Sequence, residues 1–327
     1  MSSAAPVSVV LPTHRRSHLL RQVITPLLED PAVREVLVVV DGEDDGAAEV
    51  LDAMAAGDSR LQRLASPRRG GAAARQHGAS CSTGDVVLFL DDDVVPGPGL
   101  ATGHAAAHAG ATEGEELVVV GYMPTATGEG GLERFATDLY AAEYEAMCRT
   151  YERDEAEVLR KLWGGNISVP RHLLEQVPYE SADFTTTNHS DRDFGLRCLR
   201  RGARGVFLRE LRAQHVHTRP LPQFLRDAYR QGAGRAQIHH HHPDLVGELD
   251  PSGTLRGLPA PLRLVVSLDH HEVVRRPLSA ALLVLSRSSL ALGSARGLST
   301  GARLLRRLET RRGERDFLAG ATARHEG

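Results

Sequence analysis

The first half of the chain alternates short apolar runs with segments of helical periodicity. The runs at 7–11, 36–40 and 86–90 are continuously apolar, which is typical of strands buried on both faces. Apolar residues recur at helical spacing over 19–28, where Pro26 is expected to kink or shorten the helix, and again over 47–56. A strand at 61–64, a small-residue helix that begins at Gly70-Gly71 and a strand at 117–120 follow. Strands joined by crossover helices predict an α/β fold with a mostly parallel sheet flanked by helices.

The second half predicts more helix. Residues 132–162 form an acidic helix or helical pair that ends at Gly164-Gly165, and 167–170 are extended. A helix over 191–201 is closed by Gly202, and a strand at 205–208 and a helix at 221–231 follow. From 262 to 318 leucine and arginine alternate at roughly helical intervals, which predicts a helical C-terminal extension.

Composition excludes several classes of protein. A chain of 327 residues with 41% hydrophobic and 25% charged residues is ordinary for a globular protein, and its net charge of -3 gives no reason to expect nucleic-acid binding. Lys161 is the only lysine and is followed by Leu162, so a phosphate-binding loop of the Gly-Lys-Ser/Thr kind is excluded. The three cysteines are widely spaced, and we expect reduced thiols, no signal peptide, no membrane span and a cytoplasmic location.

Three consecutive carboxylates, Asp91, Asp92 and Asp93, follow the strand at 86–90. In open α/β sheets, ligands bind just outside the carboxyl ends of the strands. Three neighbouring acids repel one another unless a cation compensates them, and such oxygen ligands suit Mg²⁺ or Mn²⁺ together with substrate phosphates. A solvated acidic turn is the simpler alternative for this segment.

Together with these carboxylates, several other motifs of the sequence resemble those of the family 2 glycosyltransferases, which have the Rossmann-like GT-A fold. The resemblance covers about the first two-thirds of the chain and rests on six motifs in the family's order. Two of them depart from the usual pattern, because Gln76 replaces an asparagine and Ser190 replaces a glutamate. The motifs are Val9-Val10-Leu11-Pro12-Thr13, Val38-Val39-Val40-Asp41-Gly42, Gly70 to Ala79, Asp91-Asp92-Asp93, Gly164-Gly165-Asn166 and Ser190 to Arg197.

The resemblance implies a GT-A catalytic domain over 1–235 and a helical extension over 236–327. Within the catalytic domain, 1–120 would form the nucleotide-binding half and 121–235 the acceptor-binding half. The activity it implies is that of a hexosyltransferase, which moves a sugar from a nucleotide-diphosphate sugar to an acceptor hydroxyl with inversion. Mg²⁺ or Mn²⁺ would be the cofactor.

The resemblance also assigns roles to residues, with Asp191 as the general base. Expected nucleotide-binding residues are Pro12, Thr13, Asp41, Arg75 and Asp91. Expected metal ligands are Asp93 and His217, with Asp91 and His215 as alternatives, since the spacing Ala213-x-x-x-His217 fits slightly better. Expected acceptor-binding residues are Trp163, Gly164, Gly165 and Asn166.

Simpler interpretations remain open for single residues. Asp191 stands at a helix start and is also a candidate N-cap. Asp41 before Gly42 is compatible with a plain turn, and Arg75 with a solvated helix arginine. The four-histidine tract at 239–242 is tempting as a metal site, but adjacent residues of a helix point in different directions.

Other functions are also weighed. The pattern Asp91-x-Asp93 imitates the nucleophile motif of haloacid-dehalogenase-like phosphatases, but the lysine that chemistry requires is missing from any matching context. A sugar-nucleotide pyrophosphorylase would need a glycine-rich first loop, and a non-catalytic sugar-nucleotide-binding module would need no base. A retaining transferase on the same fold stays open.

The C-terminal region raises the question of partners. From Arg275 to Arg315 there are ten arginines against two acids, Glu309 and Glu314. A basic amphipathic helix of this kind is typical of contact with a membrane surface or a partner, and the alternative is a solvated arginine face that packs its leucines on the catalytic domain. We expect a nucleotide-sugar donor and an unidentified hydroxyl acceptor. A homodimer and peripheral membrane contact through these helices stay open, and the solvated arginine face is the favoured alternative.

Overall fold

The computed structural model describes residues 5–112, 114–126, 131–186, 188–216, 221–250, 252–267, 272–291 and 295–320. The chain forms two compact units, one of Met1–Ala126 and Ala141–His217 and the other of Thr127–Tyr140 and Thr218–Gly327. Helix α5 (Gly131–Arg153) therefore contributes residues to both units. The boundary after residue 235 that the sequence predicts falls inside helix α9 (Leu221–His241), which belongs to the second unit.

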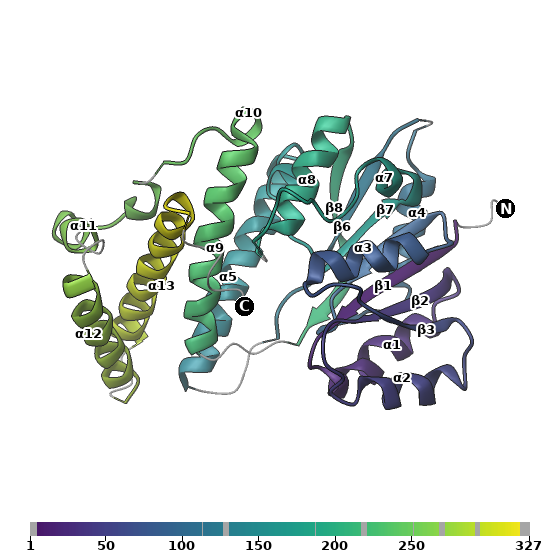
Figure 1. Cartoon of the computed structure of the whole chain (residues 1–327), viewed down its shortest axis with the longest axis horizontal. Coiled ribbons are helices and arrows are strands. Elements are labelled where there is room, and N and C mark those ends of the chain that lie inside the picture. The colour runs from purple at the N-terminus through teal and green to yellow at the C-terminus, as the bar shows by residue number, and fades with distance from the viewer. Residues whose placement is uncertain are drawn as a thin grey trace. The chain divides into compact units, whose positions relative to one another are not determined.

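The first unit is built on an eight-stranded sheet of order β3-β2-β1-β4-β7-β6-β8-β5 (Figure 1). Strands β3, β2, β1 and β4 are parallel, as are β6 and β8. The expected α/β fold is confirmed, but the sheet is more mixed than the sequence predicts, because β7 runs antiparallel between β4 and β6 and β5 runs antiparallel to β8. The strands are β1 (Val7–Thr13), β2 (Val33–Val40), β3 (Leu61–Ala65), β4 (Val86–Leu90), β5 (Val94–Pro96), β6 (Leu117–Tyr122), β7 (Asn166–Pro170) and β8 (Arg204–His215).

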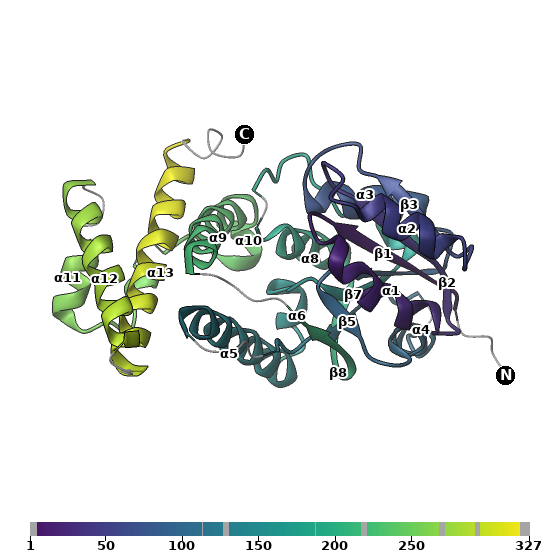
Figure 2. The same cartoon turned by 90° about the horizontal axis from the view of Figure 1, so that it is seen from below.

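Helices cover both faces of this sheet, and β1 shows why (Figures 1 and 2). Its alternate side chains point to opposite faces, so Val9 packs in the cluster that contains Ile24 of α1, whereas Val10 packs in the cluster that contains Ala74 of α3. Helix α3 lies so close that a Cβ on Gly78 would be 2.4 Å from Val10 Cγ1, which explains its small residues. The helices here are α1 (Leu20–Leu28), α2 (Ala47–Ala55), α3 (Gly71–Cys81), α4 (Leu100–Ala109), α6 (Glu157–Arg160), α7 (Arg171–Gln176) and α8 (Ser190–Arg201), with a 3₁₀ turn at Ser17–Leu19.

The second unit is helical, which confirms the expected helical character of the C-terminal region. Helices α9 and α13 pack at very short range, because a Cβ on Gly232 would lie 1.9 Å from the Thr310 carbonyl oxygen and a Cβ on Gly313 would lie 1.9 Å from that of Tyr229. No helix in the described residues is long and apolar enough to cross a membrane. Besides α9, the elements are α10 (Pro243–Val246), a 3₁₀ turn at Gly253–Leu255, α11 (Ala260–Ser267), α12 (Glu272–Ala291) and α13 (Ala295–Leu318).

Candidate active site

The carboxylates Asp91, Asp92 and Asp93 lie in the turn between β4 and β5, at the carboxyl end of β4. The side chains of Asp92 and Asp93 are only 5% and 4% exposed, and burying such charges is costly unless they are paired. Arg16, from the loop after β1, supplies the positive charge: its Nη1 lies 2.5 Å from Asp92 Oδ1 and 3.1 Å from Asp93 Oδ2. The backbone N–H of His14 also donates to Asp92 at 3.2 Å. Burial raises the pKa of Asp92, Arg16 opposes that shift, and Asp93 adds to it.

Asp93 also contacts His215, the last residue of β8. The antiparallel pairing of Val94 with His215 brings the imidazole to the turn, where Nε2 lies 3.3 Å from Asp93 Oδ2. Carboxylates suit Mg²⁺ and Mn²⁺, whereas imidazole suits transition metals, so this pair of donors fits Mn²⁺ better than Mg²⁺. Within the described residues no three His, Cys, Asp or Glu side chains are grouped to hold a metal by themselves. The other candidate ligand, His217, lies outside the described residues.

Arg75 of α3 pairs with the first carboxylate, Asp91. Its guanidinium also lies over the ring of Tyr179, with Cζ 5.5 Å from the ring centroid. Gln76 holds that tyrosine in place, because its Oε1 accepts the Tyr179 backbone N–H at 2.7 Å. The Arg75 Nε is buried and has no hydrogen-bond partner among the described residues, which is costly for a buried donor. The atom thus leaves a hydrogen-bond donor unsatisfied beside Asp91 and Tyr179.

Asp41 follows β2 and holds the start of α3. Its two carboxylate oxygens accept the Gly70 backbone N–H at 3.2 and 3.0 Å, and Gly70 has a φ of +117°, a conformation that favours glycine. The Asp41 N–H donates to the Thr13 carbonyl at 2.8 Å. Thr13 and Pro12 are buried in β1, and Thr13 Oγ1 has no hydrogen-bond partner within the described part of the chain. Thr13 Oγ1 is thus a second buried polar atom whose hydrogen bonding is unsatisfied in this region.

Asp191 lies in the first turn of α8 and reaches across to Gly164. Its Oδ2 accepts the Gly164 N–H at 2.6 Å, and its Oδ1 accepts the Arg192 N–H at 2.8 Å. The helix begins at Ser190, so Asp191 is not its N-cap. Burial raises the pKa of Asp191, and the two N–H donors partly offset that shift.

Gly165, the residue after Gly164, contacts Asp91. Its carbonyl accepts the Asp91 N–H at 3.1 Å, and its φ is +109°. A Cβ at this position would lie 2.9 Å from Asp91 Oδ2 and 2.8 Å from Met123 Sδ, so only glycine fits. Gly164 thus binds the Asp191 carboxylate, while Gly165 binds the Asp91 backbone and lies against the Asp91 carboxylate, so the glycine pair lies between the two acids in one site.

Asp193, two residues after Asp191, has a different environment. It is 3% exposed, and the Arg197 Nε donates to its Oδ2 at 2.8 Å, one helical turn further on. Asp193 therefore braces α8 and does not face Gly164.

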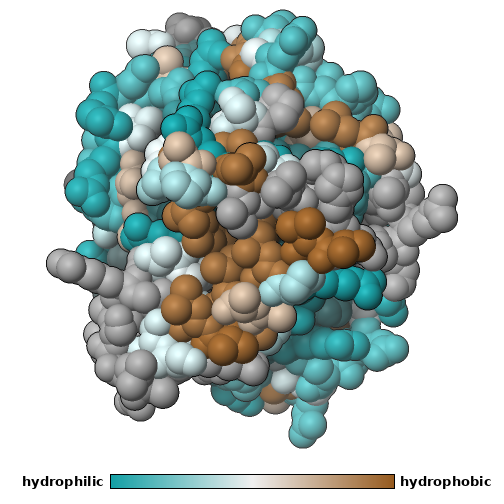
Figure 3. Space-filling model, turned by 90° about the vertical axis from the view of Figure 1, so that its left-hand side faces the viewer, coloured by the Kyte–Doolittle hydropathy of each residue, from teal (hydrophilic) through white to brown (hydrophobic). Residues whose placement is uncertain are grey.

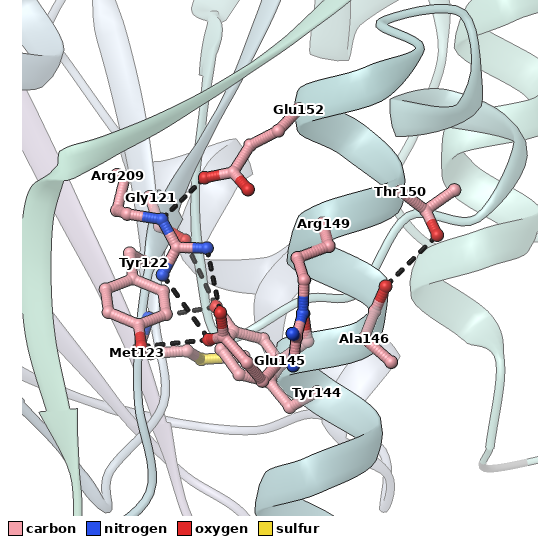
Figure 4. Close-up of polar contacts among 10 residues, drawn as sticks. All are labelled: Gly121, Tyr122, Met123, Tyr144, Glu145, Ala146, Arg149, Thr150, Glu152 and Arg209. Atoms are coloured by element: carbon pink, nitrogen blue, oxygen red, sulfur yellow. Dashed lines mark hydrogen bonds and ion pairs between the residues drawn. The ribbon is translucent and has the colours of Figure 1, made fainter.

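An ion-pair cluster holds α5 to β6 and β8 beside this site (Figure 4). Arg209 donates to Glu152 at 2.6 Å and to Glu145 at 3.1 Å, and its guanidinium lies over the ring of Tyr122, 4.4 Å from the centroid. The Tyr122 hydroxyl donates to Glu145 at 3.0 Å. Burial works to raise the pKa of Glu145, but the hydrogen bonds from Arg209 and Tyr122 outweigh it and lower the pKa.

The same helix positions Trp163. The Tyr144 hydroxyl accepts the Met123 backbone N–H at 2.9 Å, and the Tyr144 ring meets Trp163 edge-on, with centroids 5.4 Å apart. Trp163 is partly exposed and directly precedes Gly164. It is thus placed beside the Asp191 carboxylate by packing on α5.

Asn166, the remaining candidate acceptor residue, does not join the site. Its Oδ1 lies 3.0 Å from His104 Nε2, and its Nδ2 donates to the Leu211 carbonyl at 3.1 Å. His104 Nδ1 and His108 Nε2 each lie 2.8 Å from Ser168 Oγ. Burial lowers the pKa of His104 to about 3 and that of His108 to about 4, so both rings are neutral in this network. The network anchors β7 directly after the glycine pair.

The structure thus brings together Asp91, Asp92, Asp93, Arg75, His215, Gly164, Gly165 and Asp191 in the first unit. Sequence reasoning missed Arg16 and Tyr179. Arg16 could have been found, since it follows the first strand at the edge of the sheet that also carries Asp91. Tyr179 follows Pro178 in a loop and gives no signal in the sequence.

The fold is shared with solved glycosyltransferases. The structure of mannosyltransferase PcManGT from Pyrobaculum calidifontis, in complex with GDP-Man and Mn²⁺, matches 97% of this chain and 88% of its own, with a TM-score of 0.57 and 18% identity. Glucosyl-3-phosphoglycerate synthase from Mycobacterium tuberculosis, in complex with UDP, matches 75% of this chain and 82% of its own, with a TM-score of 0.52 and 20% identity. The first unit is therefore a GT-A-type α/β domain.

Sequence comparison relates the first part of the chain to one protein family. Residues 8–159 match the model for glycosyl transferase family 2. Succinoglycan biosynthesis protein ExoU of Rhizobium meliloti is 27% identical over 139 residues, which are 42% of this chain and 41% of that protein. Glycosyltransferase GlyG of Streptococcus pneumoniae is 32% identical over 92 residues, 27% of this chain and 31% of GlyG, so the chain spans less than half the length of either relative. The first part of the chain is therefore similar to family 2 glycosyltransferases, which favours sugar transfer over the phosphatase and pyrophosphorylase alternatives.

Proposed function

We propose that this chain transfers a hexosyl group from a nucleotide-diphosphate sugar to an acceptor hydroxyl, with inversion, and that Asp191 is the general base. The observation that carries the proposal is the glycine pair, which holds the Asp191 carboxylate beside Asp91. Asp91 belongs to the segment that matches the family, and Asp191 lies outside it. A base next to the expected nucleotide site is what transfer to a hydroxyl requires.

The nucleotide is proposed to bind at the edge formed by Pro12, Thr13, Asp41, Arg75 and Asp91. Two buried polar atoms there, Thr13 Oγ1 and Arg75 Nε, have no partner among the described residues, and a polar ligand would satisfy them. The relatives with this fold have been crystallised with GDP-Man or UDP. A nucleoside diphosphate of this kind is therefore the proposed leaving group.

A divalent ion is proposed to be held by Asp93 with His215 or His217, and Mn²⁺ fits the donors better than Mg²⁺. When bound, such an ion neutralises the negative charge that develops on the diphosphate. Its remaining ligands would come from the substrate's phosphates, because the chain offers no closed set of ligands in its described part. PcManGT was crystallised with Mn²⁺, which supports this assignment.

Asp191 is proposed to take the proton of the acceptor hydroxyl onto a carboxylate oxygen as the oxygen attacks the sugar. The two backbone N–H groups fix the carboxylate, and its raised pKa makes it a better base than an exposed aspartate. Since only the deprotonated carboxylate accepts a proton, the rate should rise with pH through that raised pKa. The glycines and Trp163 would line the acceptor side, while Asn166 would act there only by anchoring β7.

Replacement of Asp191 by asparagine tests the proposal. We expect Asp191→Asn to lower turnover by about 10²- to 10⁴-fold, the usual worth of a general base, while donor binding by calorimetry changes little. Asp193→Asn is the matched control: it breaks the buried pair with Arg197, so it should lower the melting temperature before it lowers turnover. Turnover of Asp191→Asn near the wild-type rate would remove Asp191 as the base and favour a retaining mechanism.

Three further expectations accompany this proposal: a cytoplasmic location, a homodimer, and contact of the C-terminal helices with a membrane surface. Light scattering on the purified chain tests the dimer, and fractionation of the source cells tests the location. The membrane contact has its own structural argument, which follows.

A further inference from the structure

Helix α12 of the second unit presents an apolar face to solvent. Val273 is 86% exposed, Val284 62% and Leu285 44%, although side chains of this kind are normally buried. The exposed positions recur every three or four residues, which places them on one side of the helix. Those described are Val273, Arg276, Pro277, Ala280, Ala281, Val284, Leu285 and Ser288.

The opposite side of α12, which packs on α13, contributes Leu278, Leu282 and Leu283 to the hydrophobic cluster of the second unit. It buries Leu282 together with Ser286 and Ser289. Ser286 Oγ donates to the Leu282 carbonyl at 2.8 Å, and a Cβ on Gly301 of α13 would lie 2.3 Å from that hydroxyl oxygen. The helix therefore carries apolar side chains on its exposed side as well as on its packed side, unlike an ordinary surface helix with one apolar face.

Helix α11 extends this apolar surface. It joins the same hydrophobic cluster as α12 and α13, through Val266 and Leu262, and it exposes Leu264 by 65%. Figure 3 shows a hydrophobic patch on the side of the molecule where Figures 1 and 2 place α11 and α12. We call Leu264, Val273, Val284 and Leu285, with the alanines between them, the outer apolar face. Contiguous patches of this kind mark an interaction site.

The charges on these helices indicate which kind of partner the outer apolar face binds. Arg263 and Arg276 are exposed beside the outer apolar face, and Glu272 is the only acid in the sequences of α11 and α12. A second copy of the chain docked on this face would bring like charges together, whereas phosphate head groups would neutralise them. An apolar stripe flanked by arginines is typical of helices that lie in the membrane interface.

We propose that the outer apolar face of α11 and α12 binds the surface of an anionic lipid bilayer. The arginines would meet the head groups, and the apolar side chains would enter the boundary of the acyl chains. The sequence pointed to the whole basic stretch from Arg275 to Arg315, and this proposal narrows the contact to α11 and α12. Two arginines of α13 make contacts within the second unit: Arg306 donates to Gln231 at 3.1 Å, and Arg312 lies over the ring of Tyr229.

Vesicle flotation tests the proposal without donor or acceptor, so its outcome is independent of the proposed transferase activity. The full chain is mixed with vesicles of phosphatidylcholine and phosphatidylglycerol in equal parts, or of phosphatidylcholine alone, at low and high salt. We expect flotation with the anionic vesicles and a loss of it in high salt. Replacing Arg276 by glutamine should weaken partition by about fivefold, the worth of one basic residue near an anionic surface.

Two charge substitutions distinguish binding through this face from nonspecific adsorption of the protein to vesicles. Val284→Glu and Leu264→Glu change side chains that are more than half exposed, so folding should be unaffected, but each should reduce partition at least about tenfold. Leu318→Glu, at an equally exposed leucine at the end of α13, is the control and should float like the wild type.

Two outcomes would overturn the proposal. One is a wild-type chain that stays out of anionic vesicles at low salt. The other is a self-associated chain whose dimer dissociates in Val284→Glu while vesicle binding is absent, which would make a second copy the occupant of this face.

Discussion

The buried pair His104 and His108 should make the stability of the first unit depend on pH. This dependence extends to a higher pH than the range in which carboxylates titrate. His104 and His108 share the Ser168 hydroxyl in a network closed by Asn166. Burial holds their pKa values at about 3 and about 4, against an ordinary value of 6.5. Between these values the unfolded chain binds protons and the folded chain does not. We therefore expect the free energy of unfolding to fall as the pH drops below 6.5.

The size of the effect follows from proton linkage. At pH 5.5, a histidine whose pKa is 6.5 unfolded and 4 or lower folded costs about 1.4 kcal/mol relative to pH 8. Two such histidines cost about 3 kcal/mol, which is a large part of the roughly 5–15 kcal/mol that stabilises a domain. An exposed histidine contributes nothing, because its pKa is the same in both states.

The single tryptophan provides the assay. Trp163 packs edge-on against Tyr144, so its emission in a urea titration reports on the first unit. We expect the urea midpoint to stay nearly level from pH 8 to pH 7 and then to fall down to pH 5.5, while the dependence of the unfolding free energy on urea (the m-value) stays constant. The double variant His104→Gln, His108→Gln should have a lower midpoint but a much flatter pH dependence, and His172→Gln, at an exposed histidine, should keep the wild-type dependence.

Either of two results would refute the reasoning. A wild-type midpoint that is the same at pH 5.5 and pH 8 would mean that the rings are not held neutral. A double variant with the full wild-type slope would mean that other groups cause the dependence.

Three other predictions follow from the site and the second unit. Asp93→Ala should remove most of the Mn²⁺ dependence of nucleoside diphosphate binding by calorimetry, and equally tight wild-type binding in excess chelator would contradict the metal assignment. Asp41→Ala should weaken binding of a nucleoside diphosphate more than that of free diphosphate, because its proposed partner is the base; equal losses would point to its bond with Gly70 instead. Gly313→Ala should destabilise the second unit by about 1–3 kcal/mol, since its Cβ would meet a backbone oxygen at 1.9 Å, whereas Arg303→Ala, exposed on the same helix, should leave the melting temperature unchanged.

Hydrophobic pattern predicted most elements but not those that depend on tertiary pairing. The helix at Leu20–Leu28 forms as expected and keeps Pro26 inside it. Helix α4 was missed because its alanine-rich sequence has no apolar stripe, and β5 because three residues carry no pattern. Strand β8 was expected at 205–208 but runs to His215, since its arginine-rich continuation is ordered by β5 and by a register shift against β6.

The same distinction applies to the residues of the site: those fixed by chain position were predicted, and those that depend on tertiary contacts were not. Motif order located Asp91, Asp93 and Asp191, because chain position fixes which strand or helix end carries them. It did not locate Arg16, because the ion pair depends on a loop whose conformation includes a positive φ of 54° at Arg15. Nor could it show that the Asn166 amide turns into the buried histidine network, since side-chain direction at a strand start is set by packing.

Arg16 also affects how strongly the stability of the protein depends on its proposed metal ion. Because a tethered guanidinium already offsets part of the repulsion between Asp92 and Asp93, the fold does not depend on a metal ion for all of that compensation. We expect chelator to leave the melting temperature unchanged, unlike in domains whose folding is driven by a bound ion. The phosphates of the donor would bring further negative charge to this site. Metal occupancy would then be linked thermodynamically to the substrate concentration. The ion would behave as a co-substrate that enters and leaves with each turnover.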